Sequence, residues 1–143
     1  MSQADKLFCL VRRSWIKATP EEKLRQAVLH FMFDKGSYPN GLVALEMLPS
    51  KTSPLRRADI VSYWKNSTGS IAPLIVVECK AEKLTPQAIL QAGGYNYYLE
   101  APFIALACPQ ESFWGWFDHS KKSYAFQPGF PTYPQLLTLL NQA

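Results

Sequence analysis

Cysteine is scarce in this sequence, and its spacing excludes two common ways of stabilising a small protein. The three cysteines, at positions 9, 79 and 108, are widely separated and form no Cys-x-x-Cys pair. An odd, scattered set of cysteines argues against a disulfide framework and against a structural zinc site. We therefore expect the protein to work in a reducing compartment, the cytoplasm.

Long apolar runs and nucleotide-binding loops are also missing. No stretch approaches the roughly 18 apolar residues of a membrane-spanning helix, and the N-terminus lacks the apolar region of a signal peptide. No Gly-x-x-x-x-Gly-Lys-Ser/Thr loop occurs, which excludes a P-loop ATPase motor in this chain. We expect neither a membrane partner nor ATP dependence.

The composition is that of a globular protein with a mildly basic surface. Of 143 residues, 48% are hydrophobic and 18% are charged, which argues against disorder. Fifteen Lys and Arg outnumber eleven Asp and Glu, for a net charge of +4. A basic surface around an acidic pocket suits a polyanion, although an ordinary basic protein explains this charge equally well.

Two β-rich runs in the middle of the chain predict a β-hairpin. Ala58–Trp64 and Leu74–Cys79 flank a polar loop over 65–70. The second run is continuously apolar until it reaches Glu78, as expected for a strand that is buried on both faces. The hairpin therefore places charged residues at the end of a buried strand.

The charged residues of this hairpin are predicted to converge. Alternation along the strand puts Glu78 and Lys80 on one face and Cys79 on the other, and Asp59 in the neighbouring strand can reach the same end. Buried charges are costly unless they are paired or bind a metal. Two carboxylates suit Mg²⁺, and a nearby lysine can orient a water molecule or offset developing charge. The alternative is a solvated Glu-x-Lys pair.

A helix is predicted to begin at Thr19, with threonine as N-cap, Pro20 in the first turn and Glu22 closing a capping box. Apolar residues then recur at helical spacing up to position 32, and Gly36 is predicted to end the helix in a left-handed conformation. The helical angle directs Glu21 toward the edge of the apolar stripe and Glu22 toward solvent. Glu21 can therefore face the sheet, or it can pair with Arg25 at i, i+4.

Further elements complete an α/β pattern. Strands are predicted over 42–48, 102–108, 113–117 and 124–126, and helices from Thr85 to about Leu99 and over 133–142. This order indicates a mixed central β-sheet flanked by helices in a single domain. In the N-terminal lead-in, we expect Trp15 to pack on the first helix and Arg12, Arg13 and Lys17 to be solvated. Contact of these cations with phosphate is the alternative.

Four sequence blocks carry a resemblance to a known family. Asp59, an eighteen-residue gap and Glu78-Cys79-Lys80 resemble the PD-(D/E)XK nuclease superfamily. More narrowly, the chain looks like the N-terminal nuclease domain of type I restriction enzyme R subunits from about Val11 to Asp118. The blocks are Thr-Pro-Glu-Glu-x-x-Arg-Gln at 19–26, Arg-Arg-Ala-Asp-Ile-Val at 56–61, Val-Glu-Cys-Lys-Ala at 77–81 and Gln-x-x-x-Tyr-Asn at 91–96.

The resemblance implies a restriction-endonuclease-like core over about 11–118 within one domain of 1–143, followed by a C-terminal strand and helix over about 123–142. It implies Mg²⁺, with Mn²⁺ as a substitute, held by Asp59, Glu78 and the backbone carbonyl of Cys79. A glutamate of the first helix, assigned to Glu21, would complete this metal site. Lys80 would act on the attacking water or in the transition state.

The resemblance also implies a nucleic-acid partner. Gln91 and Tyr95 would lie beside the active site and touch DNA. Arg56 and Arg57, just before Asp59, either contact phosphate or are solvated. The chain departs from the superfamily pattern at Ala58, which stands where proline usually precedes the aspartate. The expected function is a stand-alone DNA endonuclease, with a homodimer or a partner protein left open. The alternative is a non-cleaving module that binds DNA or a partner through the same fold.

Overall fold

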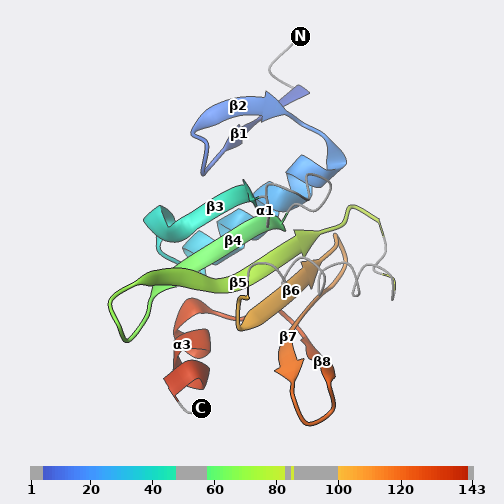
Figure 1. The fold of residues 1–143 in the computed structure, drawn as a ribbon. Coiled ribbons are helices and arrows are strands. Elements are labelled where there is room, and N and C mark those ends of the chain that lie inside the picture. The colour runs from blue at the N-terminus through green and yellow to red at the C-terminus, as the bar shows by residue number, and fades with distance from the viewer. Residues whose placement is uncertain (1–4, 48–57, 83–84, 86–99, 142–143) are drawn as a thin grey trace.

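The chain folds around a mixed six-stranded sheet, shown by a computed structural model that describes residues 5–47, 58–82, 85 and 100–141 (Figure 1). The elements in chain order are β1 (Lys6–Cys9), β2 (Ser14–Lys17), α1 (Pro20–Asp34), the short 3-10 helix η2 (Asn40–Leu42), β3 (Val43–Met47), β4 (Ala58–Lys65), β5 (Ile71–Cys79), β6 (Phe103–Ala107), β7 (Ser112–Asp118), β8 (Ser123–Pro128) and α3 (Tyr133–Asn141). The predicted mixed sheet is confirmed, and its six strands, α1 and α3 lie close to their predicted positions.

The sheet has the order β3-β4-β5-β6-β7-β8. Every neighbouring pair is antiparallel except β5 and β6, which run parallel. A parallel pair needs a crossover connection, because the chain must return to the end of the sheet at which the first strand began. The predicted helix from Thr85 to about Leu99 falls in that connection, and almost all of it lies outside the described residues.

The predicted central hairpin is confirmed, with strands longer than expected. β4 and β5 pair from Ile60 opposite Val77 to Lys65 opposite Ile71. Their turn is held by the Asn66 side chain, whose Oδ1 accepts from the backbone N–H groups of Thr68 and Ser70. From Leu74 onward every residue of β5 is buried, as the unbroken apolar run predicted.

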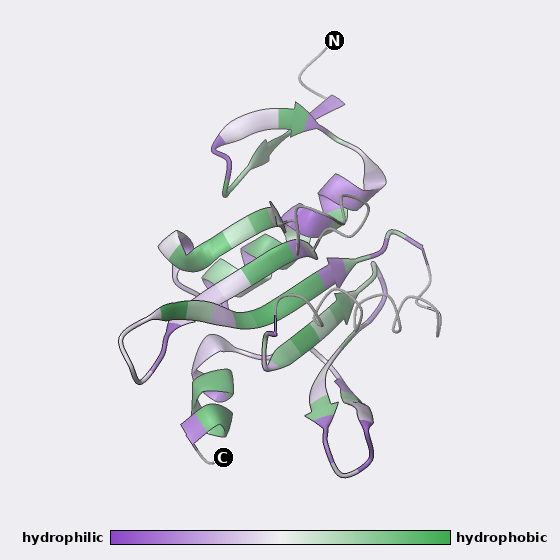
Figure 2. Ribbon diagram, in the orientation of Figure 1, coloured by the Kyte–Doolittle hydropathy of each residue, from purple (hydrophilic) through white to green (hydrophobic). Residues whose placement is uncertain are grey.

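Apolar side chains pack on both faces of the sheet. The larger cluster joins Val28, Leu29 and Met32 of α1 to Leu136 of α3 and to inward residues of the central strands, so both helices cover this face. A smaller cluster on the other face includes Val61, Val76 and Ile104. In Figure 2, most of β5 and β6 carries the green colour of hydrophobic residues. No helix in the described ranges has both the length and the apolarity that crossing a membrane requires.

Helix α1 has its predicted N-cap and ends near Lys35 as predicted, but the conformation after its C-terminal end differs. The Thr19 Oγ1 accepts from the Glu22 N–H at 3.1 Å, which is the expected N-cap. Positive φ at the C-terminal end falls on Ser37, at 61°, and not on Gly36. A side chain at Gly36 would meet the Tyr38 ring and the Met32 carbonyl within 3 Å. This glycine is therefore required by close packing, and the predicted left-handed cap was wrong.

The N-terminal lead-in also differs from its prediction. β1 and β2 form a separate two-stranded hairpin that stands at the N-terminal end of α1 (Figure 1). The Trp15 ring meets Phe8 across the hairpin at 5.5 Å between centroids, and 55% of Trp15 is exposed. The expected packing of Trp15 on the first helix was wrong, because pairing with β1 directs its side chain to the outer face of the hairpin.

Gly115 provides a test of the β7–β8 contact. A Cβ at this position would lie 1.8 Å from the Ala125 carbonyl oxygen on the neighbouring strand. Because the position of a Cβ is fixed by its own backbone and the Ala125 oxygen belongs to a paired strand, the clash cannot be relieved by a rotamer change. We expect Gly115→Ala to lower the free energy of unfolding by about 3 kcal/mol in urea titrations. Gly41→Ala is the matched control, since nothing lies within 4 Å of its added methyl group. Equal stability of the two variants would contradict the described β7–β8 packing.

Candidate functional site

The β4–β5 register brings two carboxylates together at one end of the sheet. Ile60 pairs with Val77, so Asp59 lies across from Glu78 one position further along. The Asp59 Oδ2 accepts from the backbone N–H of Cys79 at 2.8 Å. Lys80 Nζ lies 3.2 Å from Glu78 Oε1. The structure thus gathers Asp59, Glu78 and Lys80 in one place, while Cys79 faces the main apolar cluster on the other side.

A buried arginine, for which the sequence predicted no role in the site, completes the charged cluster. Arg25 of α1 is 5% exposed, and its Nη2 donates to Asp59 Oδ1 at 2.9 Å. Its Nη1 donates to Glu22 Oε1. Glu22 also lies 3.7 Å from Arg12 Nη1 in the β1–β2 turn. A chain of ion pairs therefore runs from the N-terminal hairpin through α1 to the carboxylates of the sheet.

A signal for this arginine is present in the sequence. Arg25 precedes Val28, Leu29 and Met32 by three, four and seven residues, so it belongs to the core-facing stripe of the helix. A charged residue on such a stripe needs a buried partner of opposite charge. The partner could not be named from helical spacing, because Asp59 lies 34 residues away in the chain.

The two glutamates of the first helical turn point the opposite way from their prediction. Glu21 is exposed, whereas Glu22 is partly buried, with 16% of its side chain exposed, and is ion-paired. Glu22 lies three residues before Arg25 on the same side of the helix. Because helical side chains lean toward the N-terminus, the Arg25 guanidinium reaches the Glu22 carboxylate. Glu21 is nevertheless close enough that its charge contributes to raising the pKa of Cys79, after the larger effects of burial and Asp59.

Burial changes the protonation of Glu78. Desolvation and then the neighbouring Asp59 carboxylate raise the pKa of Glu78 to about 8, against the opposing effect of the Lys80 ammonium. Glu78 Oε2 is buried and has no hydrogen-bond partner within the described part of the chain. Without a bound cation, Glu78 therefore holds a proton at neutral pH. A divalent cation between the carboxylates would reverse this preference, because it stabilises the ionised form.

The donor set fits Mg²⁺ chemically. Asp59 and Glu78 would supply carboxylate oxygens and the Cys79 backbone a carbonyl, and the buried Oε2 of Glu78 has no hydrogen-bond partner in the described ranges. No cluster of three or more His, Cys, Asp or Glu side chains suited to a metal occurs among the residues described. This is compatible with Mg²⁺, which commonly binds one or two carboxylates and keeps several waters.

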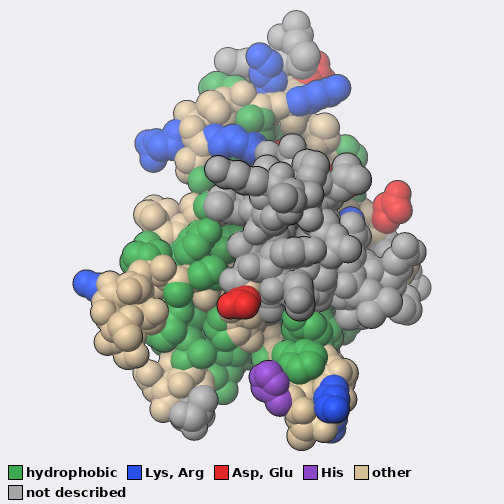
Figure 3. Space-filling model, viewed as in Figure 1, with side chains coloured by type: hydrophobic (Ala, Val, Ile, Leu, Met, Phe, Trp, Pro, Cys, Tyr) green, Lys and Arg blue, Asp and Glu red, His purple; other side chains and the backbone are tan. Residues whose placement is uncertain are grey.

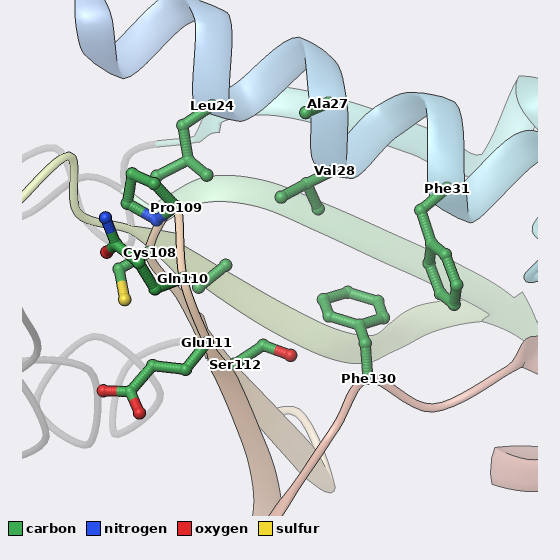
Figure 4. Close-up of a pocket in the computed structure, with 11 residues that line it drawn as sticks. Leu24, Ala27, Val28, Phe31, Cys108, Pro109, Gln110, Glu111, Ser112 and Phe130 are labelled. Carbon is green, nitrogen blue, oxygen red and sulfur yellow. The ribbon is translucent and has the colours of Figure 1, made fainter.

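A groove beside α1 shares no lining residue with this cluster. Figure 4 shows the side chains that line it. It has a volume of about 400 Å³ and lies between α1 and the connection from β6 to β7. The Phe31 and Phe130 rings meet edge to face across it, with their centroids 5.6 Å apart. None of its lining residues belongs to the charged cluster, and the lining is mainly apolar, so its chemistry does not suit a phosphodiester. The lining residues are Leu24, Ala27, Val28, Phe31, Ala107, Cys108, Pro109, Gln110, Glu111, Ser112 and Phe130.

Four residues predicted to contact DNA have no described position. Arg56 and Arg57 precede β4, and Gln91 and Tyr95 belong to the connection between β5 and β6; all four lie outside the described residues. Their roles stay predictions.

An α/β domain with two carboxylates and a lysine at the end of adjacent strands is compatible with the class of nuclease-like domains. Comparison with protein families makes this assignment more specific. The family described as Type I restriction enzyme R protein N terminus matches residues 20–131. The chain therefore belongs to this family, which links it in coarse terms to the nucleases of restriction-modification. No curated protein and no solved structure matches the chain significantly.

The pKa of Glu78 predicts a pH-dependent cost to stability. The pKa is raised in the folded state from its ordinary value of 4.5 to about 8. Its contribution to stability is therefore fully present below about pH 4.5 and is lost as pH rises through 8. In EDTA, Glu78→Gln should match the wild type near pH 4.5 and exceed it above pH 8, by on the order of 5 kcal/mol.

Chemical denaturation at several pH values measures this difference. Glu111→Gln, at an exposed position, should follow the wild type at every pH. A constant difference between Glu78→Gln and the wild type from pH 5 to pH 9 would contradict a buried, protonated Glu78.

Arg25 should be essential for stability. Arg25→Ala leaves the carboxylates of Asp59 and Glu22 without their shared cation, which should lower the free energy of unfolding by about 3–5 kcal/mol. Arg25→Lys should recover only part of this loss, because an ammonium cannot reproduce the two-pronged contact of a guanidinium. Lys23→Ala, at an exposed position of the same helix, is the control and should change stability by less than about 0.5 kcal/mol. If urea denaturation gave the same free energy of unfolding for Arg25→Ala and Lys23→Ala, the buried ion pair would not have the stabilising role described.

Proposed function

We propose that this chain is a metal-dependent nuclease that hydrolyses phosphodiester bonds of DNA through a restriction-endonuclease-like core. The observation that carries the proposal is the meeting of Asp59, Glu78 and Lys80 at one end of the sheet, within a chain that belongs to the R protein N-terminal family. A binding protein has no physical need for a buried, raised-pKa carboxylate beside a second carboxylate, because such a pair costs stability.

The residues divide the chemistry between them. Asp59, Glu78 and the Cys79 backbone carbonyl would hold Mg²⁺ or Mn²⁺. When bound, the cation lowers the pKa of a water ligand and offsets charge on the phosphate. Arg25 holds the Asp59 carboxylate in a fixed orientation through its 2.9 Å contact. From the sequence, Glu21 was assigned to the metal site. In the structure Glu22, and not Glu21, is connected to Asp59 through Arg25, so we favour Glu22 as the glutamate that supports the site.

Lys80 is suited to act on the reacting groups. A third of its side chain is exposed, and its ammonium contacts Glu78. From this position it can orient the attacking water or donate a hydrogen bond to a phosphate oxygen as negative charge develops. Its partial exposure leaves room for the substrate, whereas Glu78 is 3% exposed and is better placed to bind a cation than to contact DNA.

The chain lacks a P-loop motif, so the proposed activity does not depend on ATP hydrolysis by this chain. We place the activity in the cytoplasm, and it is compatible with a stand-alone enzyme, a homodimer or a complex with a partner protein. The second candidate function is a non-cleaving module that binds DNA or a protein. It is favoured by the net charge of +4, which supports DNA binding without chemistry.

Substitution of Lys80 separates the two functions. If Lys80 acts in the transition state, Lys80→Ala should abolish nicking of supercoiled plasmid in Mn²⁺ while affinity for DNA changes by less than about tenfold. Lys80→Arg should restore little activity, because a guanidinium gives up its proton far less readily than an ammonium. For a binding module there is no cleavage to lose, and Lys80→Ala should mainly reduce the salt dependence of binding by about one phosphate contact.

Metal binding is measured in parallel. Mn²⁺ should raise the melting temperature of the wild type and of Lys80→Ala, and it should have no such effect on Asp59→Ala or Glu78→Ala. A wild type that binds Mn²⁺ but nicks plasmid no faster than Lys80→Ala would refute the catalytic assignment.

A further inference from the structure

The β1–β2 hairpin has an outer face whose composition is unusual for a water-exposed sheet. Lys6 pairs with Lys17, and Phe8 pairs with Trp15, so all four side chains lie on the same face. Each of the four is exposed. The opposite face carries Leu7, Cys9 and Ile16, which are buried or partly buried. We call the outer set of Lys6, Phe8, Trp15 and Lys17 the hairpin platform.

The two lysines of the platform are placed at a cost to stability. Side chains directly opposite in an antiparallel pair approach within about 5 Å at Cβ, and like charges there are destabilising. The two rings add a second cost, because Phe8 is 41% exposed and Trp15 is 55% exposed. A partner that is both anionic and rich in flat apolar surface would relieve both costs at once.

Nucleic acid has this combination of properties. Its bases stack on exposed aromatic rings, and its phosphates pair with lysines and arginines alongside. Four basic and one acidic side chain occur between Asp5 and Ala18, which makes this segment strongly basic. Figure 3 shows Lys and Arg side chains gathered over the hairpin. Arg13, exposed in the turn between the strands, extends this positive surface.

The platform is physically connected to the candidate active site. Arg12 in its turn contacts Glu22, Glu22 contacts Arg25, and Arg25 contacts Asp59. Three successive ion pairs thus separate the hairpin from the carboxylates of the sheet. A strand held on the platform would therefore contact an element that these ion pairs connect to the proposed cleavage site.

We propose that the hairpin platform binds single-stranded nucleic acid, with bases stacked on Trp15 and Phe8 and phosphates paired with Lys6, Lys17 and Arg13. Single strands are favoured over duplex because stacking on a protein ring needs an unpaired base. This inference deepens the proposed function, since it names a surface that holds the substrate. It does not require cleavage, and its residues differ from those predicted to touch DNA from the sequence alone.

The test measures binding of a fluorescent oligothymidine of about twenty nucleotides to the full chain in EDTA, where no metal-dependent cleavage occurs. Trp15→Ala should weaken binding about tenfold, through loss of stacking. Trp15→Phe should retain most of the affinity, because it keeps an aromatic ring. Trp116→Ala is the matched control, since Trp116 is also exposed but lies on β7, away from the hairpin, and it should bind like the wild type.

The lysines are tested through salt dependence. The double variant Lys6→Ala/Lys17→Ala should lower the slope of log affinity against log salt by about 1.4, as expected for two contacts with single-stranded phosphates. Lys121→Ala/Lys122→Ala removes the same charge from the β7–β8 turn and should leave the slope unchanged. If circular dichroism shows that Trp15→Ala does not fold, the comparison of these two double-lysine variants tests the inference by itself.

Two outcomes would overturn the inference. In the first, Trp15→Ala binds oligothymidine as tightly as the wild type, and the salt slope of Lys6→Ala/Lys17→Ala is unchanged. In the second, the wild type does not bind oligothymidine. A hairpin whose variants lose binding to anionic phosphatidylglycerol vesicles, but not to oligothymidine, would indicate a membrane surface instead. Failure of the proposed nuclease function is distinguishable, because the wild type would then bind through the platform in EDTA and still not nick plasmid in Mn²⁺.

Discussion

The ion pair between Arg25 and Asp59 holds the charged end of this protein together. Its guanidinium is buried where α1 crosses the sheet, and the Asp59 carboxylate uses one oxygen for Arg25 and the other for the Cys79 N–H. This arrangement joins the helix to β4 and β5. It also fixes the orientation of one carboxylate beside the buried Glu78. Because breaking a buried pair leaves an uncompensated charge, the same contact supports both the fold and the proposed chemistry.

The cluster also shows how stability and function oppose one another here. A buried Glu78 with a pKa of about 8 destabilises the metal-free protein at high pH. A divalent cation would remove that cost, since it stabilises two adjacent ionised carboxylates. A similar tension exists at the hairpin platform, where two rings and two opposed lysines are kept in water. In both places a local arrangement that is unfavourable by itself would become favourable if a ligand of opposite charge bound.

Much of the site could be predicted because it depends on local rules. The alternation of side chains along a strand was enough to separate Glu78 and Lys80 from Cys79, and the polar loop between two apolar runs was enough to pair β4 with β5. The α1 N-cap at Thr19 followed from residue types alone. Predictions failed where a distant group decided the outcome. Gly36 was expected to adopt positive φ, yet it is kept small by the Tyr38 ring and the Met32 carbonyl.

The sequence by itself determined the order of the elements, the strand faces and the motif that identifies the family, because each depends on residues near one another in the chain or on a fixed pattern. Only the tertiary structure decided which glutamate of the first turn is drawn inward, since the direction of Glu22 depends on an arginine whose position is set by Asp59. Only the pairing of β1 with β2 decided that Trp15 faces water. In each case the deciding interaction joins separate elements, and the free energy of burying or pairing a side chain there exceeds the weak preference encoded locally.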